Sequence, residues 1–230
     1  MFDINKHKYY LVRILKDIYS DELLNSVLGF KGGTAHMFLY NLPRFSVDLD
    51  FNLLEKEKSK IVFDKLKNIL LKYGDIKDEA EKYFGILLVL NYGAEERNLK
   101  VEVSNREFAD SYQIQNYLGI PMLVMLPEDM FAHKLCALTD RRTIANRDVF
   151  DIYYFLSTGI SINKEIVKAR TKMKFEEYID YCIDSVKMIK KGSLLNGLGE
   201  LVDKDTKLFV KTKLQDEVIS LLQIFKTYSF

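Results

Sequence analysis

Cysteine is scarce in this chain, which has only Cys136 and Cys182 among its 230 residues. Two cysteines are too few to hold a small secreted fold together by disulfides, and they lack the spacing of a metal-binding motif. We therefore expect both to be reduced, partly buried thiols.

Long apolar runs are also missing. No run of about 18 apolar residues could span a bilayer, and the first residues, Met1-Phe2-Asp3-Ile4, lack the basic start and apolar centre of a signal peptide. We expect a cytoplasmic protein with no membrane contact. Its length allows a full core, which favours one catalytic domain with a helical extension over two independent units.

An excess of charge of one sign is absent too. The 34 basic and 33 acidic residues leave a net charge of +1, which argues against a protein that coats nucleic acid by bulk electrostatics. A local basic patch remains open, because lysines gather in the last third, at Lys187, Lys190, Lys191, Lys204, Lys207, Lys211 and Lys213. The alternative is an ordinary solvated helix face.

What the sequence does contain is a strand-like segment with two carboxylates, Ser46 to Phe51. Polar residues alternate there with Val47, Leu49 and Phe51, the period-two pattern of a half-buried strand. Asp48 and Asp50 should therefore point to the same face. Carboxylates so close repel each other unless a divalent cation lies between them, which suggests Mg²⁺.

A glycine pair precedes this segment. Gly32-Gly33-Thr34 follows a short apolar run and opens a helix-like segment, which predicts a strand, a turn and a helix. Glycines let the backbone approach an anion, and the free N–H groups of a helix start favour negative charge. Thr34 could cap the helix or donate its hydroxyl to a phosphate. A glycine pair is more often only a turn. The carboxylates that follow make phosphate binding the better hypothesis.

These two segments together resemble the AbiEii/AbiGii toxin family, whose members have the minimal nucleotidyltransferase fold of the DNA polymerase β superfamily. The match runs through Gly32-Gly33-Thr34-Ala35 and then Arg44-Phe45-Ser46-x-Asp48-Leu49-Asp50-Phe51. The resemblance implies an α+β fold, a mixed β-sheet flanked by helices with a C-terminal helical region. It also implies Mg²⁺ at Asp48 and Asp50, and an NTP bound by Gly32, Gly33, Thr34 and Ser46.

The remaining elements are predicted from periodicity. Residues 5–27 favour helix with a break near Ser20-Asp21-Glu22, His7 is expected at the surface, and residues 106–121 are expected to form a loop. We place a catalytic domain at residues 1–126 and a helical domain at 127–230. The other expected elements are a helix at 55–73, strands at 84–92 and 99–104 joined by a turn at 93–96, and helices from 127, from 146, at 163–170, 175–190 and 213–228.

Glu102 is a candidate third metal ligand. In the predicted strand at 99–104, Val101 and Val103 face the core and Glu102 faces the other way, where an acidic residue is commonly just solvated. If this strand lies near Asp48 and Asp50, Glu102 completes a three-carboxylate cluster suited to Mg²⁺. It resembles the third carboxylate of the superfamily, although related toxins do not all depend on this acid.

Lys134 lies beside the apolar stripe of the helix that begins near Pro127. A lysine at such an edge usually extends its ammonium to solvent. The alternative is that it meets the triphosphate, where it would stabilise developing negative charge. Lys134-Leu135-Cys136-Ala137 resembles the lysine-bearing helix of the family, so we adopt the second interpretation.

Asp148 and Asp151 lie three residues apart and so share one face of the next predicted helix. A favourable helix-start acid and an i,i+4 pair of Arg147 with Asp151 would explain them without catalysis. They also resemble the last family motif, Asp-x-x-Asp, which implies that one of them orients Lys134 or activates the acceptor hydroxyl.

The sequence thus predicts a Mg²⁺-dependent nucleotidyltransferase toxin that uses an NTP. The resemblance implies an RNA acceptor, tRNA in some relatives, and a separately encoded antitoxin. One alternative is a nucleotidyltransferase acting on a small molecule such as an antibiotic, which would need an acidic pocket for a cationic acceptor. The other is a catalytically silent binding module, against which the intact acids argue. Which NTP and acceptor are used stays open.

Overall fold

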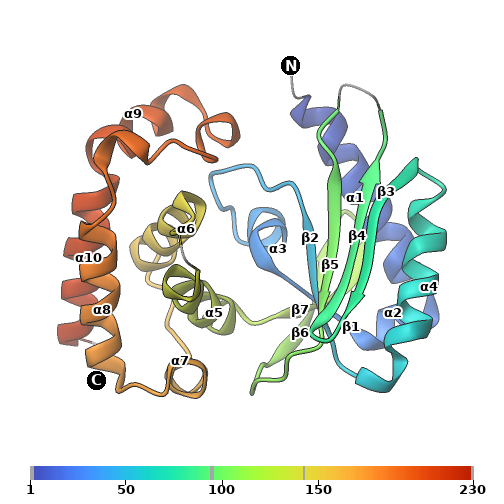
Figure 1. Ribbon diagram of the computed structural model, residues 1–230, viewed down its shortest axis with the longest axis horizontal. Helices are drawn as coiled ribbons and strands as arrows, with labels where there is room; N and C mark the ends of the chain where they lie inside the picture. Colours follow the sequence, from blue (N-terminus) through green and yellow to red (C-terminus); the bar gives the residue numbers. More distant parts are fainter. Residues whose placement is uncertain (1–2, 94–95, 142, 229–230) are drawn as a thin grey trace. The chain divides into compact units, whose positions relative to one another are not determined.

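The computed structural model describes residues 3–93, 96–141 and 143–228 (Figure 1). The chain forms two compact units. Unit 1 consists of residues 1–41, 45–107 and 111–125, and unit 2 of residues 42–44, 108–110 and 126–230. Ala94 and Glu95 of the predicted turn at 93–96 lie outside the described residues.

Unit 1 is built on a mixed β-sheet, so the predicted α+β class is confirmed. Among the described residues the sheet has seven strands in the order β3-β4-β5-β2-β1-β7-β6. β2 with β5 and β1 with β7 are parallel pairs, and the other neighbours are antiparallel. The strands are β1 (Leu28–Lys31), β2 (Leu49–Leu53), β3 (Asp75–Lys82), β4 (Gly85–Asn91), β5 (Leu99–Ser104), β6 (Tyr112–Tyr117) and β7 (Ile120–Met125).

Helices cover both faces of this sheet. Figure 1 shows α1, α2 and α4 on one face and α3 on the other. Tyr19 of α1 contacts the ring of Phe51, which packs against Phe30, so the apolar side chains of the central strands face the helix layer of α1. The bounds are α1 (Ile4–Ser20), α2 (Glu22–Val27), α3 (Gly32–Leu39) and α4 (Ser59–Leu70), preceded by a 3₁₀ turn at Lys56–Lys58.

Three strands of unit 1 were not predicted. β3 is an edge strand whose residues are mostly exposed and charged, so it shows no apolar alternation. The loop predicted at 106–121 is wrong, because residues 112–125 form the hairpin of β6 and β7. Its turn, Leu118-Gly119, has positive φ at both residues, a conformation usually signalled by Asn-Gly. Leucine in the first position hides this signal.

Unit 2 is helical, as predicted for the C-terminal region. Its core includes Phe131 stacked on Phe155, and the buried Tyr178, whose hydroxyl donates to the carbonyl of Leu135. Cys136 and Cys182 are free and buried, and burial raises the pKa of both thiols. The helices are α5 (Pro127–Asp140), α6 (Asn146–Ser157), α7 (Lys164–Thr171), α8 (Phe175–Lys187), α9 (Lys204–Thr212) and α10 (Leu214–Tyr228), with 3₁₀ turns at Lys191–Ser193 and Gly199–Leu201.

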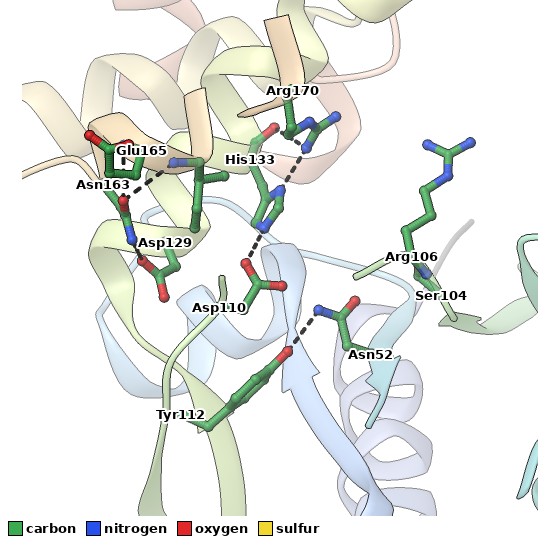
Figure 2. Close-up of polar contacts among 11 residues, drawn as sticks. Asn52, Ser104, Arg106, Asp110, Tyr112, Asp129, His133, Asn163, Glu165 and Arg170 are labelled. Carbon is green, nitrogen blue, oxygen red and sulfur yellow. Dashed lines mark hydrogen bonds and ion pairs between the residues drawn. The ribbon is translucent and has the colours of Figure 1, made fainter. Parts of the chain in front are cut away.

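The segment 108–110 belongs to unit 2 through a chain of polar contacts (Figure 2). His133 Nε2 lies 2.6 Å from Asp110 Oδ1, and Arg170 donates to His133 Nδ1 at 2.7 Å. Because arginine can only donate, Nδ1 is the acceptor and Nε2–H the donor. Phe108 packs edge-on against His133. Residues 108–110 therefore pack as part of unit 2, although they precede α5 in the chain.

In the part of the chain that the structure describes, no helix is both long and apolar enough to cross a bilayer.

Candidate functional site

Two predicted metal ligands meet on one face of the sheet of unit 1. Asp50 and Glu102 are register partners on the parallel strands β2 and β5, and register partners point their side chains to the same face. Both line a cavity of about 330 Å³, whose other polar lining residues include Lys31, Lys82 and Arg106. Asp50 is half-buried and Glu102 is exposed, and Asp48 lies immediately before the first residue of β2.

The glycine pair forms the start of α3, next to Asp50. Gly32 has φ +78, and a β-carbon built there would lie 2.4 Å from Asp50 Oδ2. Any other residue would suffer backbone strain and also displace this carboxylate. Gly32 is therefore required both by its conformation and by the closeness of Asp50.

Thr34 and Ser46 are both buried. Thr34 lies within the first turn of α3, not at its cap, and its hydroxyl donates to the carbonyl oxygen of Asp48. The side chain thus fixes the start of α3 to the residue that precedes β2. The backbone N–H of Ser46 contacts the sulfur of Met37, also on α3, at 3.3 Å.

His7 is fully buried, so its predicted surface position is wrong. Its Nε2 lies 2.8 Å from the carbonyl oxygen of Val47 and its Nδ1 2.5 Å from the hydroxyl of Tyr92. A carbonyl only accepts, so Nε2 carries the proton and Nδ1 accepts from Tyr92. Burial lowers the pKa of His7. A neutral imidazole from α1 therefore holds the backbone next to Asp48.

We expect acidification to destabilise unit 1 through His7. Because its pKa is lowered in the folded protein, the unfolded chain binds more protons, and stability falls as the pH drops from about 6.5 through the folded-state value. A pKa lowered by one unit corresponds to about 1.4 kcal/mol. Urea unfolding followed by circular dichroism at pH 7, 6 and 5 should show a smaller loss in His7→Gln than in the wild type. Equal losses in both proteins would contradict this assignment.

The donor chemistry of this face fits Mg²⁺ held by a pair of carboxylates. Among the described residues, no group of three or more His, Cys, Asp or Glu side chains is arranged to hold a metal ion, so Asp48, Asp50 and Glu102 do not form the predicted three-carboxylate cluster here. Mg²⁺ commonly takes only one or two carboxylates and completes its octahedron with water and substrate phosphates. Asp50 with one neighbouring acid meets that requirement.

The second set of predicted residues lies in unit 2 and forms one ion-pair cluster. Lys134 Nζ lies 2.9 Å from Asp148 Oδ1 and 3.0 Å from Asp151 Oδ2. Asp151 also accepts two bonds from Arg44, at 2.5 Å from Nε and 2.6 Å from Nη2. The four charges balance, and Arg141 approaches Asp148 Oδ2 at 3.5 Å. Two carboxylates of α6 thus hold the ammonium of Lys134, which lies on α5.

The environment of Asp151 keeps this acid ionised. Burial opposes ionisation of Asp151, but Arg44 and Lys134 outweigh it and lower the pKa of Asp151 to about 2. Burial likewise opposes the charge on Lys134, yet Asp151 and Asp148 raise its pKa. Asp151 is therefore an ionised partner that accepts protons poorly. Its predicted i,i+4 partner, Arg147, is replaced in the structure by Arg44, 107 residues away.

Several residues of these sites carried no predicted role. Arg44 and Lys31 stand inside or next to the motifs quoted from the sequence, but the sequence around a basic residue does not indicate a partner far along the chain. Lys31 is the register partner of Asp50. Phe84 and Arg106 line the cavity from the ends of the hairpin strands β4 and β5, and only their flanking position could have indicated this.

Comparison with known proteins identifies the kind of chain this is. Residues 13–219 match the family model described as nucleotidyl transferase AbiEii toxin, type IV toxin–antitoxin system. A search of curated proteins found no match.

Two solved structures from Helicobacter pylori are similar to this chain. JHP933 superposes with a TM-score of 0.59 at 20% identity, covering 99% of this chain and 94% of that one. A candidate nucleotidyltransferase superposes with a TM-score of 0.58 at 20% identity, covering 96% and 94%. At this identity the likeness concerns the fold, and it confirms the predicted nucleotidyltransferase fold.

Proposed function

Because the chain belongs to the AbiEii family of nucleotidyltransferase toxins from type IV toxin–antitoxin systems, we propose that it transfers a nucleotidyl group from an NTP to an RNA hydroxyl, with Mg²⁺ as cofactor and tRNA as the acceptor. In this reaction the acceptor oxygen forms a bond to the α-phosphorus, the bond to the bridging oxygen breaks, and pyrophosphate leaves. The family also implies an antitoxin encoded separately, which we propose as the controlling partner.

The observation that carries this proposal is the arrangement of Gly32, Asp50 and Glu102. It pairs two carboxylates by strand register and leaves no room for a β-carbon beside one of them. Asp50 would hold Mg²⁺ together with Asp48, and Glu102 is the alternative second acid. Bound there, Mg²⁺ supplies positive charge to the oxygens of the reacting phosphate.

We assign the triphosphate to the start of α3. The N–H groups of the first helical turn have no intrahelical partners and favour anions. Gly32 and Gly33 would bring the backbone close to the phosphates. Because the Thr34 hydroxyl donates to Asp48, the proposed contribution of Thr34 is its backbone N–H. Ser46 is buried, and we propose that it supports this turn.

Lys134 is proposed to neutralise charge on the phosphates. The support is internal to unit 2, where two carboxylates hold the ammonium at 2.9 and 3.0 Å. Two of its three protons are used in this way, which leaves one donor. Asp151, with a pKa of about 2, is suited to holding Lys134 and not to accepting the hydroxyl proton. Asp148 shares the positioning role and is the remaining candidate for the base.

We expect Lys134→Met to lower transfer by about 10²–10³-fold, the loss found when one preorganised donor to a developing charge is removed. Methionine keeps an apolar stem of similar length, so packing is largely preserved. Transfer of labelled nucleotide measures the effect, with Lys187→Met as the control, since Lys187 is exposed and pairs with the exposed Asp184. Transfer within about threefold of wild type would show that Lys134 has only a structural role.

The charge around the cavity favours an anionic acceptor. Its charged lining residues are three basic and two acidic side chains, Lys31, Lys82, Arg106, Asp50 and Glu102. A small-molecule nucleotidyltransferase with a cationic acceptor would need the opposite balance. The C-terminal lysines add less support, because Lys187 and Lys191 pair with Asp184 and Asp216.

The test is direct transfer by the purified chain. Every reaction contains the protein, one labelled NTP and Mg²⁺. Total RNA, purified tRNA or a cationic antibiotic is added as the acceptor, each in its own reaction. Label appearing in tRNA supports the proposal, and label in the antibiotic alone would assign the small-molecule reaction. If no acceptor is labelled and the protein also fails to bind NTP in the presence of Mg²⁺, the catalytically silent binding module is favoured.

A further inference from the structure

Two aromatic side chains stand exposed beside the carboxylates of unit 1. Tyr83 and Phe84 form the turn between β3 and β4, and they are 87% and 56% exposed. Phe84 lines the same cavity as Asp50 and Glu102. Large aromatic residues are usually buried because their transfer out of water is favourable. An exposed aromatic ring that lines this cavity, next to a second exposed ring, therefore indicates a ligand site.

The backbone beneath these rings is fixed. Gly85 has φ +145, and a β-carbon there would lie 2.0 Å from the carbonyl oxygen of Val103, so β4 and β5 approach each other closely. The backbone N–H of Asn105 donates to the carbonyl of Phe84, and its side-chain amide donates to the carbonyl of Tyr83 at 2.9 Å. The rings thus project from a turn that is tied to the neighbouring strand.

Arg106 adds a cation to this platform. Its guanidinium lies 4.7 Å from the ring centroid of Phe84, within the range of a cation–π contact. Its backbone N–H donates to the hydroxyl of Ser104 at 3.3 Å, and Figure 2 shows the two residues together at the end of β5. Arg106 is exposed. An aromatic face next to a positive charge is the usual combination for holding a base and its phosphate.

We propose that Phe84 and Arg106 form a stacking site for a nucleobase at the edge of the carboxylate cavity. Arg106 covers one face of the Phe84 ring, so the base would stack on the other face, and Arg106 supplies charge for a neighbouring phosphate. The inference rests on the proposed function for its substrate class. Two nucleotides enter that reaction, the NTP and the end of the acceptor RNA, and both present the same chemistry of base and phosphate.

The lack of tryptophan in the chain gives a direct probe of this site. Phe84→Trp introduces a single indole, whose fluorescence should be quenched when a base stacks on it. The matched control is Tyr9→Trp, since Tyr9 on α1 is also 56% exposed and has Arg13 over its ring at 5.8 Å, but does not line the cavity. Titration with NTP alone and with a short single-stranded RNA alone separates the two sources of the base.

We expect quenching of Phe84→Trp by one of these ligands and none of Tyr9→Trp. In parallel, Phe84→Leu should weaken binding of that ligand about 5–150-fold, the range for loss of one base–aromatic stack. Phe84→Tyr should retain affinity, and Arg106→Gln should reduce the salt dependence of RNA binding. Because Phe84 is exposed, thermal unfolding of these variants should match the wild type.

Binding and transfer are read separately, so failures can be told apart. Quenching without any nucleotide transfer would overturn the proposed function and leave the stacking site. Transfer with unchanged affinity in Phe84→Leu for both NTP and RNA would overturn the stacking site and leave the function. In that case the exposed aromatic pair would be assigned to a protein partner.

Discussion

Replacing Asp50 by asparagine should lower nucleotide transfer by about 10³-fold or more. The change keeps the shape of the side chain against Gly32 but removes the negative charge proposed to hold Mg²⁺. Metal stabilisation of a reacting phosphate is worth several kcal/mol, and each 1.36 kcal/mol corresponds to a factor of ten in rate. The measurement is transfer of labelled nucleotide at saturating Mg²⁺.

Two controls accompany this variant. Its thermal unfolding without metal should equal or exceed that of the wild type, because removal of one acid relieves repulsion. Glu102→Gln should have a smaller effect on transfer, since Glu102 is exposed whereas Asp50 is half-buried against Gly32. Transfer by Asp50→Asn within about tenfold of wild type would show that this face is not the metal site.

Replacing Arg44 by methionine should destabilise the protein by about 3–5 kcal/mol. The substitution removes the bidentate partner of Asp151, whose side chain is 2% exposed, and removal of one partner of a buried pair leaves an uncompensated charge. The pKa of Asp151 should rise from its value of about 2, so the stability difference between variant and wild type should shrink as the pH falls through this range and Asp151 becomes protonated. Urea unfolding followed by circular dichroism measures both effects.

The double variant Arg44→Met/Asp151→Leu separates the charge from the packing. Replacing both members of a buried pair by apolar residues is often close to neutral, so the double variant should be more stable than Arg44→Met alone. A single variant within about 1 kcal/mol of wild type would mean that Lys134 suffices to compensate Asp151. The prediction for Arg44 would then be wrong.

The sequence was informative where chemistry is local. The glycine pair and the alternating acids lie within 20 residues, and both the strand-turn-helix at Gly32 and the strand at Asp50 were predictable from period and residue type. Strand β3 was not predictable, because an edge strand exposed to solvent on both faces shows no alternation of apolar and polar residues. The hairpin of β6 and β7 was hidden by Leu118 at a positive φ.

Contacts between distant residues were beyond such patterns. Arg44 could be seen to accompany the motif, but nothing in its neighbourhood indicates a carboxylate 107 positions later. His7 was assigned to the surface because it lacks nearby metal-like partners, whereas it bonds the carbonyl of Val47 across 40 positions. Its amphipathic helix gave the signal that was missed, since a histidine on a buried face needs polar partners.

The membership of residues 42–44 in unit 2 has a consequence for synthesis of the chain. At about 5–20 residues per second on the ribosome, the 107 positions from Arg44 to Asp151 take roughly 5–20 s. During that interval the strands that carry Asp50 and Glu102 have emerged, while Arg44 has no α6 to bind. The clamp around Lys134 is therefore assembled only after translation has passed Asp151, and a chain released before that point lacks it.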